Sequence, residues 1–380
     1  MNRNLYLDNN ATTGVYPEVL EAMMPYFYKN YGNPSSAHDY GIMAKRAISD
    51  SREYLASLIG ASHDEIYFTS GGTESDNWAL NIASKYSNPH IVTSKIEHHA
   101  ILNKCLAMRK EGVKISYLDV DHEANIDLNM LSELLRKQVT MVSVMTANNE
   151  IGTVSQYRRI GIMAREYGAL YHTDAVCAFG KIPIDVNKDH IDMLSATAHK
   201  IHGPKGVGLL YVGKNVKIEP MIYGGGQEGG YRSGTENVPG IVGFAKAAMI
   251  SFKRMEYRHS VVRKFRDYMV SCILTIKGAY LLGSKSSCLD HTMCFAFEGV
   301  YGETLLMLLN ERKICVSNGS ACHANSDGAS HVLMAMGVDK ELLYNTIRIS
   351  IDDNITKYEI DMTVKAIREI VDIIREKERE

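Results

Sequence analysis

The chain has 380 residues, of which 45% are hydrophobic, so it is long enough to bury the cores of two domains. Its 42 basic and 44 acidic side chains nearly cancel, which argues against nucleic acid or a membrane surface as a partner and favours a small substrate. The apolar runs are far shorter than the roughly 20 residues of a membrane helix, and without a leader-like opening segment we expect a cytoplasmic protein.

From about residue 60 to residue 212, short runs rich in Ile, Val, Tyr and Leu alternate with helix-like segments. Amphipathic helices are expected, for instance, at 127–137 and 160–167. The pattern predicts an α/β domain with a mainly parallel central sheet, helices on both faces, and ligands at the carboxyl ends of the strands. The expected strands are 65–69, 90–94, 114–119, 141–147, 169–174, 192–197 and 207–212.

The pattern changes after a glycine-rich stretch at 224–230. One long helix is expected from residue 238 to about residue 274, followed by separated strands and helices. We therefore expect a large domain at 14–255 and a smaller α+β domain built from 1–13 and 256–380. The mixed charges of the last helix are typical of a solvated face.

A possible phosphate site follows the first strand of the large domain. Gly71 and Gly72 let the backbone approach a ligand closely, and Thr73 lies where a helix is expected to begin. The free N–H groups and the positive dipole end of that helix favour an anion. The same turn is also common as a simple tight connection, so this signal alone leaves both readings open.

Two further signals lie at strand ends. Asp174 closes the strand at 169–174, where a buried carboxylate needs a partner such as a protonated pyridine nitrogen; it could also simply cap the next segment. Lys200 follows the next strand, and a lysine with little room for its charge suits Schiff-base formation, although a lone lysine is more often on the surface. Together the signals indicate a carbonyl cofactor held covalently by Lys200.

These three signals together resemble a pyridoxal phosphate enzyme. The resemblance becomes specific through a series of motifs that run in family order from about residue 5 to residue 350. The chain resembles the cysteine desulfurases, which are fold-type I enzymes of the class V aminotransferase group. The motifs are YLDNNATT (6–13), YGNPSS (31–36), TSGGTES (69–75), EH (97–98), NNEIG (148–152), HKIHGPKG (199–206), RSGTEN (232–237) and GSAC (319–322).

The resemblance implies a fold-type I transferase fold and a bound pyridoxal 5'-phosphate, with no metal. Lys200 would form the Schiff base, and Asp174 would pair with the pyridine nitrogen. His98 would stack on the ring and move protons, while Asn149 would lie near the ring oxygen. The remaining implied cofactor contacts are Gly72, Thr73, Thr197 and His199 around the phosphate, with Thr235 contributed by the other subunit of a homodimer.

The resemblance also implies how the substrate is held and used. Asn33 and Arg348 would bind the carboxylate of L-cysteine, since an arginine can do so with two parallel hydrogen bonds. Cys322 would take the sulfur as a persulfide, release L-alanine, and pass the sulfur to an acceptor or scaffold protein, for instance in iron–sulfur cluster assembly. Cys322 lies in a loop-like run of small and polar residues, beside His323 as a candidate for ionising the thiol.

The other cysteines are scattered, without a zinc-like cluster, and are expected to be reduced. Cys177 stands where the family normally has a glutamine that donates to the ring oxygen, and a thiol is a shorter and weaker donor. Asp352 replaces a usual glycine. The chain could be a desulfurase with an altered rate, a selenocysteine lyase, or a lyase for another sulfur or selenium amino acid. A second redox role for Cys177 and a non-catalytic sulfur-transfer scaffold are further alternatives, but the presence of Lys200, Cys322 and Arg348 argues against the scaffold.

Overall fold

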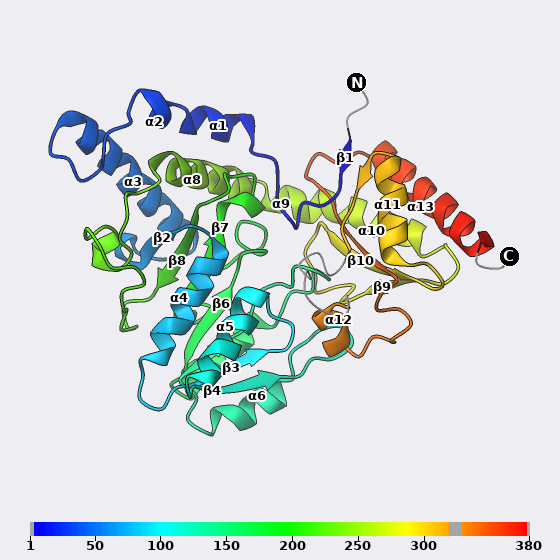
Figure 1. The fold of residues 1–380 in the computed structure, drawn as a ribbon, viewed down its shortest axis with the longest axis horizontal. Coiled ribbons are helices and arrows are strands. Elements are labelled where there is room, and N and C mark those ends of the chain that lie inside the picture. The colour runs from blue at the N-terminus through cyan, green and yellow to red at the C-terminus, as the bar shows by residue number, and fades with distance from the viewer. Residues whose placement is uncertain (1–3, 319–328, 378–380) are drawn as a thin grey trace.

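The computed structural model describes residues 4–318 and 329–377. These residues form two lobes, connected through the region of α9 (Met255–Tyr257) (Figure 1). One lobe is built around a large sheet and the other around β9 (Ala279–Leu282) and β10 (Thr292–Phe297). Cys322 and His323 lie outside the described residues. Within the described ranges, none of the helices is long and apolar enough to cross a membrane.

The larger lobe contains a seven-stranded sheet with the spatial order β2-β8-β7-β6-β5-β3-β4. All neighbouring pairs are parallel except those made by β8, which is antiparallel to both of its neighbours. The predicted mainly parallel sheet is therefore confirmed. Its strands are β2 (Ile66–Thr69), β3 (His90–Ser94), β4 (Lys114–Leu118), β5 (Met141–Ser143), β6 (Leu170–Asp174), β7 (Met193–Thr197) and β8 (Gly208–Val212).

Each expected strand is present, with ends that differ by a few residues. The largest difference is β5, which ends at Ser143 and not at residue 147. The backbone N–H groups of Val144 and Thr146 still donate to the carbonyl groups of His172 and Asp174, at 3.2 and 2.9 Å. The chain thus stays beside β6 while it leaves the regular sheet, which keeps the following residues close to Asp174.

Alternating side chains of the strands pack into two separate cores, because successive residues point to opposite faces of a sheet. Val92 and Val142 belong to one core, while Ile91 and Met141 belong to the other. Helices cover both faces, as predicted. The first core includes side chains of α1 (Pro17–Met23), α3 (Asp39–Leu58), α6 (Leu128–Leu135), α7 (Tyr157–Glu166) and α8 (Val238–Lys253), and the second includes those of α4 (Gly72–Ser84) and α5 (His99–Lys110).

The smaller lobe has an antiparallel sheet of order β12-β10-β9 and a parallel pair of β1 with β11. Leu7 packs here with residues from 262 to 374 in a third core, although the chain between 17 and 253 builds the other lobe. The remaining elements are β1 (Leu5–Tyr6), α2 (Pro25–Tyr28), α9 (Met255–Tyr257), α10 (Arg263–Ile273), β9 (Ala279–Leu282), β10 (Thr292–Phe297), α11 (Gly302–Glu311), β11 (Ile314–Cys315), α12 (His331–Ala335), β12 (Thr346–Ser350) and α13 (Lys357–Lys377).

The prediction of one helix from 238 to about 274 is wrong. The helix breaks after α8 at Arg254, and Arg258–Val262 forms a π-helical segment before α10. The side chain of Arg258 explains the interruption, because it donates to the carbonyl oxygens of Ser251 and Gly180 and to the carboxylate of Asp353. The break lies between the two lobes and supports our proposed domain division at 255/256, although Leu289 of the second part packs in the core of the large sheet.

Candidate active site

The carboxyl ends of β6 and β7 bring the predicted acid and lysine to one edge of the sheet. Asp174 is the last residue of β6 and pairs with Ser195 of β7. Thr197 ends β7, and the following 3₁₀ turn, Ala198–Lys200, carries the lysine. Because these two strands are parallel neighbours, residues beyond their ends share the edge at which α/β folds bind ligands.

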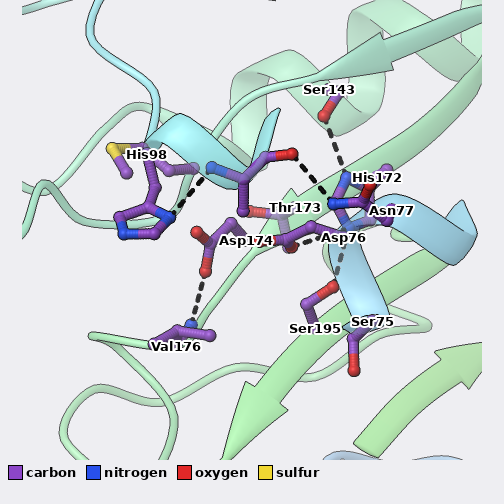
Figure 2. A network of polar contacts seen from close by, with 12 residues as sticks. Ser75, Asp76, Asn77, His98, Ser143, His172, Thr173, Asp174, Val176 and Ser195 are labelled. Carbon is purple, nitrogen blue, oxygen red and sulfur yellow. Dashed lines mark hydrogen bonds and ion pairs between the residues drawn. The ribbon is translucent and has the colours of Figure 1, made fainter. Parts of the chain in front are cut away.

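Asp174 is a buried carboxylate with 6% of its surface exposed. Its Oδ1 accepts a hydrogen bond from the Val176 N–H at 2.8 Å, so the side chain does cap the next segment, as the alternative interpretation expected (Figure 2). Burial raises the pKa of Asp174, while nearby His98 and Lys200 act in the opposite direction. A cationic partner, such as a protonated ring nitrogen, would relieve the cost of this buried charge.

Behind Asp174 lies a buried polar network that the sequence reasoning missed (Figure 2). His172 contacts Ser143 Oγ through Nδ1 at 2.9 Å and Ser195 Oγ through Nε2 at 3.0 Å. Burial lowers the pKa of His172 to about 3, so the ring is neutral at neutral pH. Burial and Asp174 raise the pKa of Asp76, which lies 3.8 Å from His172. Polar residues within short, otherwise apolar strands, such as His172 in β6 and Ser195 in β7, were the available signal.

His98 is fixed at the N-terminus of α5. Its Nδ1 accepts the backbone N–H of Ala100 at 3.1 Å, so a neutral ring carries its proton on Nε2. Burial lowers the pKa of His98, with Asp174 opposing that shift. The preceding Glu97 is also buried, and burial raises its pKa to about 8. Glu97 and His98 therefore carry little charge at neutral pH.

The Lys200 amine lies against the N-terminal segment. Nζ donates to the carbonyl oxygens of Asn10 and Ala11, the latter at 3.1 Å. The neighbouring His199 contacts Thr12 Oγ1 through Nδ1 at 3.2 Å, and burial lowers its pKa to about 4. Residues that follow β1 of the small lobe thus help to position the lysine of the large lobe.

The start of α4 lies where the sequence predicts a phosphate site. A Cβ atom added to Gly72 would lie 2.5 Å from Val176 Cγ2, so only glycine allows the helix to approach the segment after Asp174 this closely. Thr73 follows in the first turn, where backbone N–H groups have no partner within the helix. Glu74, although in the same turn, is paired with Arg232 at 2.8 Å. The donor set and the buried acid fit a phosphate and a pyridine ring.

Arg348 of β12 is 3% exposed and reaches towards the same edge from the small lobe. Nη1 donates to the carbonyl oxygen of Asn149 at 3.0 Å, and Nη2 to Asp8 Oδ1 at 2.7 Å. Its Nε is buried without a hydrogen-bond partner in the described part of the chain. The guanidinium therefore has an unused donor, which suits an additional anionic ligand.

Comparisons with known proteins agree with this geometry. A model of the class-V aminotransferases matches residues 5–362. A cysteine desulfurase IscS of Methanosarcina thermophila is 43% identical over 98% of this chain and 93% of that protein. The chain belongs to the class-V aminotransferases, among the cysteine desulfurases.

Solved structures of this class-V aminotransferase group share the fold. A NifS-like protein has a TM-score of 0.92 and 39% identity, over 97% of this chain and 100% of that one. A structure titled "SspA in complex with cysteine" has a TM-score of 0.81 and 35% identity, over 91% of this chain and 98% of that one. The resemblance stated from the motifs and the predicted fold-type I architecture are both confirmed.

Two predicted residues of this class-V aminotransferase are exposed in loops, one is buried in the core, and one lies outside the described residues. Asn33 is exposed in the loop between α2 and α3, two helices that lie on the large lobe, whereas β10 and its partner strand β12 belong to the small lobe (Figure 1). Thr235 is exposed in the loop before α8. Cys177 is 5% exposed and packs in the core of the large sheet. Cys322 is outside the described residues. The roles of these four, like those of the other predicted site residues, stay predictions.

Proposed function

We propose that this class-V aminotransferase is a pyridoxal phosphate-dependent cysteine desulfurase that converts L-cysteine to L-alanine. The observation that carries the proposal is the convergence of buried Asp174 with the partly buried His98 and Lys200 at one strand edge. Relatives that are 41% to 44% identical over at least 98% of this chain are named cysteine desulfurases. One solved relative is described in complex with cysteine.

Pyridoxal phosphate, when bound, would supply an electron-poor ring that stabilises negative charge at the substrate Cα. Lys200 would hold it covalently, and Asp174 would keep its ring nitrogen protonated. Gly72 and Thr73 would present backbone N–H groups to the phosphate at the start of α4. Thr197 and His199 would complete that phosphate site, and Asn149 and Cys177 would lie near the ring oxygen.

The substrate would be held and deprotonated by groups around the same edge. Arg348 would bind the carboxylate of L-cysteine, with Asn33 supplied from a second copy of the chain. His98 would stack on the cofactor and move a proton through Nε2, because its Nδ1 is occupied by the Ala100 N–H. The hydrogen bond from the Ala100 N–H to Nδ1 limits how far the His98 ring can turn.

Sulfur transfer would require Cys322. Its thiolate would attack the substrate sulfur, and the electron pair of the broken carbon–sulfur bond would remain with the substrate carbon, which takes up a proton to give L-alanine. Cys322 would keep the sulfur as a persulfide and pass it to an acceptor or scaffold protein. The names of relatives fit a supply of sulfur for iron–sulfur clusters.

A homodimer would complete the site. Large exposed apolar side chains gather on α1, α2 and the first turn of α3, and such a surface is typical of a protein interface. Thr235 and Asn33 are both exposed and would reach the site of the other copy. The exposed side chains are Leu20, Met24, Phe27, Tyr28, Tyr40, Ile42 and Met43.

Release of L-alanine from L-cysteine and from L-selenocysteine, measured side by side, tests the proposal. We expect turnover of L-cysteine, its loss in Lys200→Ala together with the lysine-bound chromophore, and its loss in Cys322→Ser with the chromophore retained. A Cys177→Gln variant in the same assay tests whether Cys177 shifts the preference between sulfur and selenium. Alanine release from selenocysteine alone would support a selenocysteine lyase, and release from neither substrate would support a scaffold.

A further inference from the structure

A small polar cavity of about 20 Å³ lies beneath Lys200, between the two lobes. Its wall includes Lys181 and His291. Neither residue has a role in the proposed desulfurase reaction, yet both lie beside the lysine that would carry the cofactor. His291 is buried and Lys181 is partly buried.

A continuous series of contacts leads from Lys181 to Lys200. Lys181 Nζ lies 3.0 Å from His291 Nε2, and the same Nε2 lies 3.0 Å from Asn10 Oδ1. The backbone carbonyl oxygen of Asn10 accepts a hydrogen bond from Lys200 Nζ. Asn10 is 1% exposed and His291 is 6% exposed, so water cannot readily replace these contacts.

The orientation of the Asn10 amide is fixed by its other neighbours. Nδ2 donates to the carbonyl oxygen of Asn149 at 3.1 Å, and a backbone carbonyl oxygen can only accept. Oδ1 must therefore face His291. It needs a donor there, beyond the longer contact from Thr292 Oγ1 at 3.3 Å.

His291 Nε2 cannot serve both neighbours when Lys181 is charged. The Lys181 ammonium offers only donors and requires an unprotonated Nε2, whereas Asn10 Oδ1 requires a protonated one. Burial, followed by the nearby cations Lys181 and Arg258, lowers the pKa of His291 far below its usual value, so the ring has a single proton to place. A neutral Lys181 removes the conflict.

We propose that Lys181 and His291 are a positioning pair for Lys200, in which the protonation state of Lys181 decides whether His291 donates to Asn10 and so holds the carbonyl oxygen that receives the Lys200 amine. The inference rests on the proposed function, because it concerns the lysine that would bind pyridoxal phosphate. It adds a pair of residues that controls the position of the Lys200 amine.

The charges around the pair allow Lys181 to change state in an accessible pH range. Burial lowers the pKa of Lys181 to about 8. Asp353, whose Oδ1 pairs with Arg258 Nε at 2.7 Å, opposes this shift of the Lys181 pKa but does not outweigh burial. The charged and titratable groups that line the cavity or act on the pair are Cys177, Lys200, His202, Arg258, Arg266, Asp352 and Asp353.

The test is the rate at which full-length apoprotein forms its lysine-bound chromophore with pyridoxal 5'-phosphate, followed by absorbance from pH 6 to pH 10. In the wild type we expect an increase of about twofold to tenfold as Lys181 loses its proton, which corresponds to one hydrogen bond. Lys181→Met should lack this increase in rate with pH, and it should react at pH 7 as fast as the wild type does above pH 8. Lys188→Met, which changes an exposed lysine of the same loop, should keep it.

Substitutions of His291 separate positioning from general damage. The glutamine of His291→Gln offers a donor and an acceptor together, so this variant should form the chromophore rapidly at every pH, without the increase seen in the wild type. His291→Leu should form it slowly at every pH. Thermal unfolding of each variant checks that it is folded. If both Lys181→Met and His291→Gln kept the wild-type increase in rate between pH 6 and pH 10, the proposal would be overturned. If the wild type forms no chromophore, or Lys200→Ala still forms it, the proposed function itself fails.

Discussion

Arg348 and Asp8 form a largely buried ion pair in which Nη2 lies 2.7 Å from Oδ1. The pair joins β12 to the segment after β1 and turns the arginine towards the edge where Asp174 ends its strand. Because Asp8 and the Asn149 carbonyl oxygen use different nitrogens, the guanidinium plane is fixed before any ligand arrives.

Arg348→Lys should impair substrate binding more than turnover. A lysine retains the charge but cannot make two parallel hydrogen bonds to a carboxylate, and the loss of one charged hydrogen bond, about 1.5–3 kcal/mol, predicts a KM for L-cysteine raised about tenfold to a hundredfold. Steady-state alanine release measures this. The control is Arg312→Lys, an exposed arginine paired with Glu369. An unchanged KM would remove Arg348 from the substrate site.

Gly72→Ala should weaken both the fold and the binding of pyridoxal phosphate. The added methyl group would meet Val176 Cγ2 at 2.5 Å, and relieving such a clash costs about 1–3 kcal/mol. Chemical unfolding and cofactor titration measure the two effects. Gly14→Ala is a matched control, because no atom lies within 4 Å of the position of its added Cβ. Val176→Ala should restore Gly72→Ala, and failure to do so would place the damage elsewhere.

His172 should make the protein sensitive to acid. Its pKa is about 3 when folded against an ordinary 6.5, so the unfolded state binds more protons between these values, and stability falls as the pH drops through that window. In His172→Gln, the free energy of unfolding should depend less on pH, by up to about 1.4 kcal/mol per pH unit. Urea unfolding at pH 4 to pH 6.5 measures this, with exposed His122→Gln as the control. Identical slopes would show that His172 is not buried in its neutral form.

Phe27→Glu should separate the proposed homodimer. Phe27 is 57% exposed on α2, and a carboxylate there would be buried without a partner in an apolar interface. Light scattering should show a shift from dimer to monomer, accompanied by loss of alanine release because Asn33 and Thr235 would no longer reach a second site. Met307→Glu is the control, since Met307 is 65% exposed on α11 of the other lobe. A dimer that persists in Phe27→Glu would exclude this surface.

Local patterns were sufficient to predict much of the fold and part of the site. Asp174 and Lys200 were predictable because the end of a buried strand is visible in the sequence as the end of an apolar run. Parallel strands also end at a common edge of the sheet. The break at Arg254 was not, because the helix pattern continues through it. Two of the groups that hold the Arg258 side chain, the Gly180 carbonyl oxygen and Asp353, are distant in the sequence. Likewise, nothing near Lys181 in the sequence indicates His291.

The pairing of β1 with β11 also constrains how the protein is made. Leu5 is aligned with Ile314, so β1 can pair with its partner strand only after the last quarter of the chain has begun to be synthesised. Asn10 and Ala11, which receive the Lys200 amine, lie in the segment after that strand, which ends at Tyr6. During synthesis the large lobe can fold first, since domains generally fold as units as the chain emerges. The newly synthesised chain would therefore fold the large lobe, with Lys200, before the contacts from Asn10 and Ala11 have formed. It would become active only when β1 pairs with β11 in the small lobe.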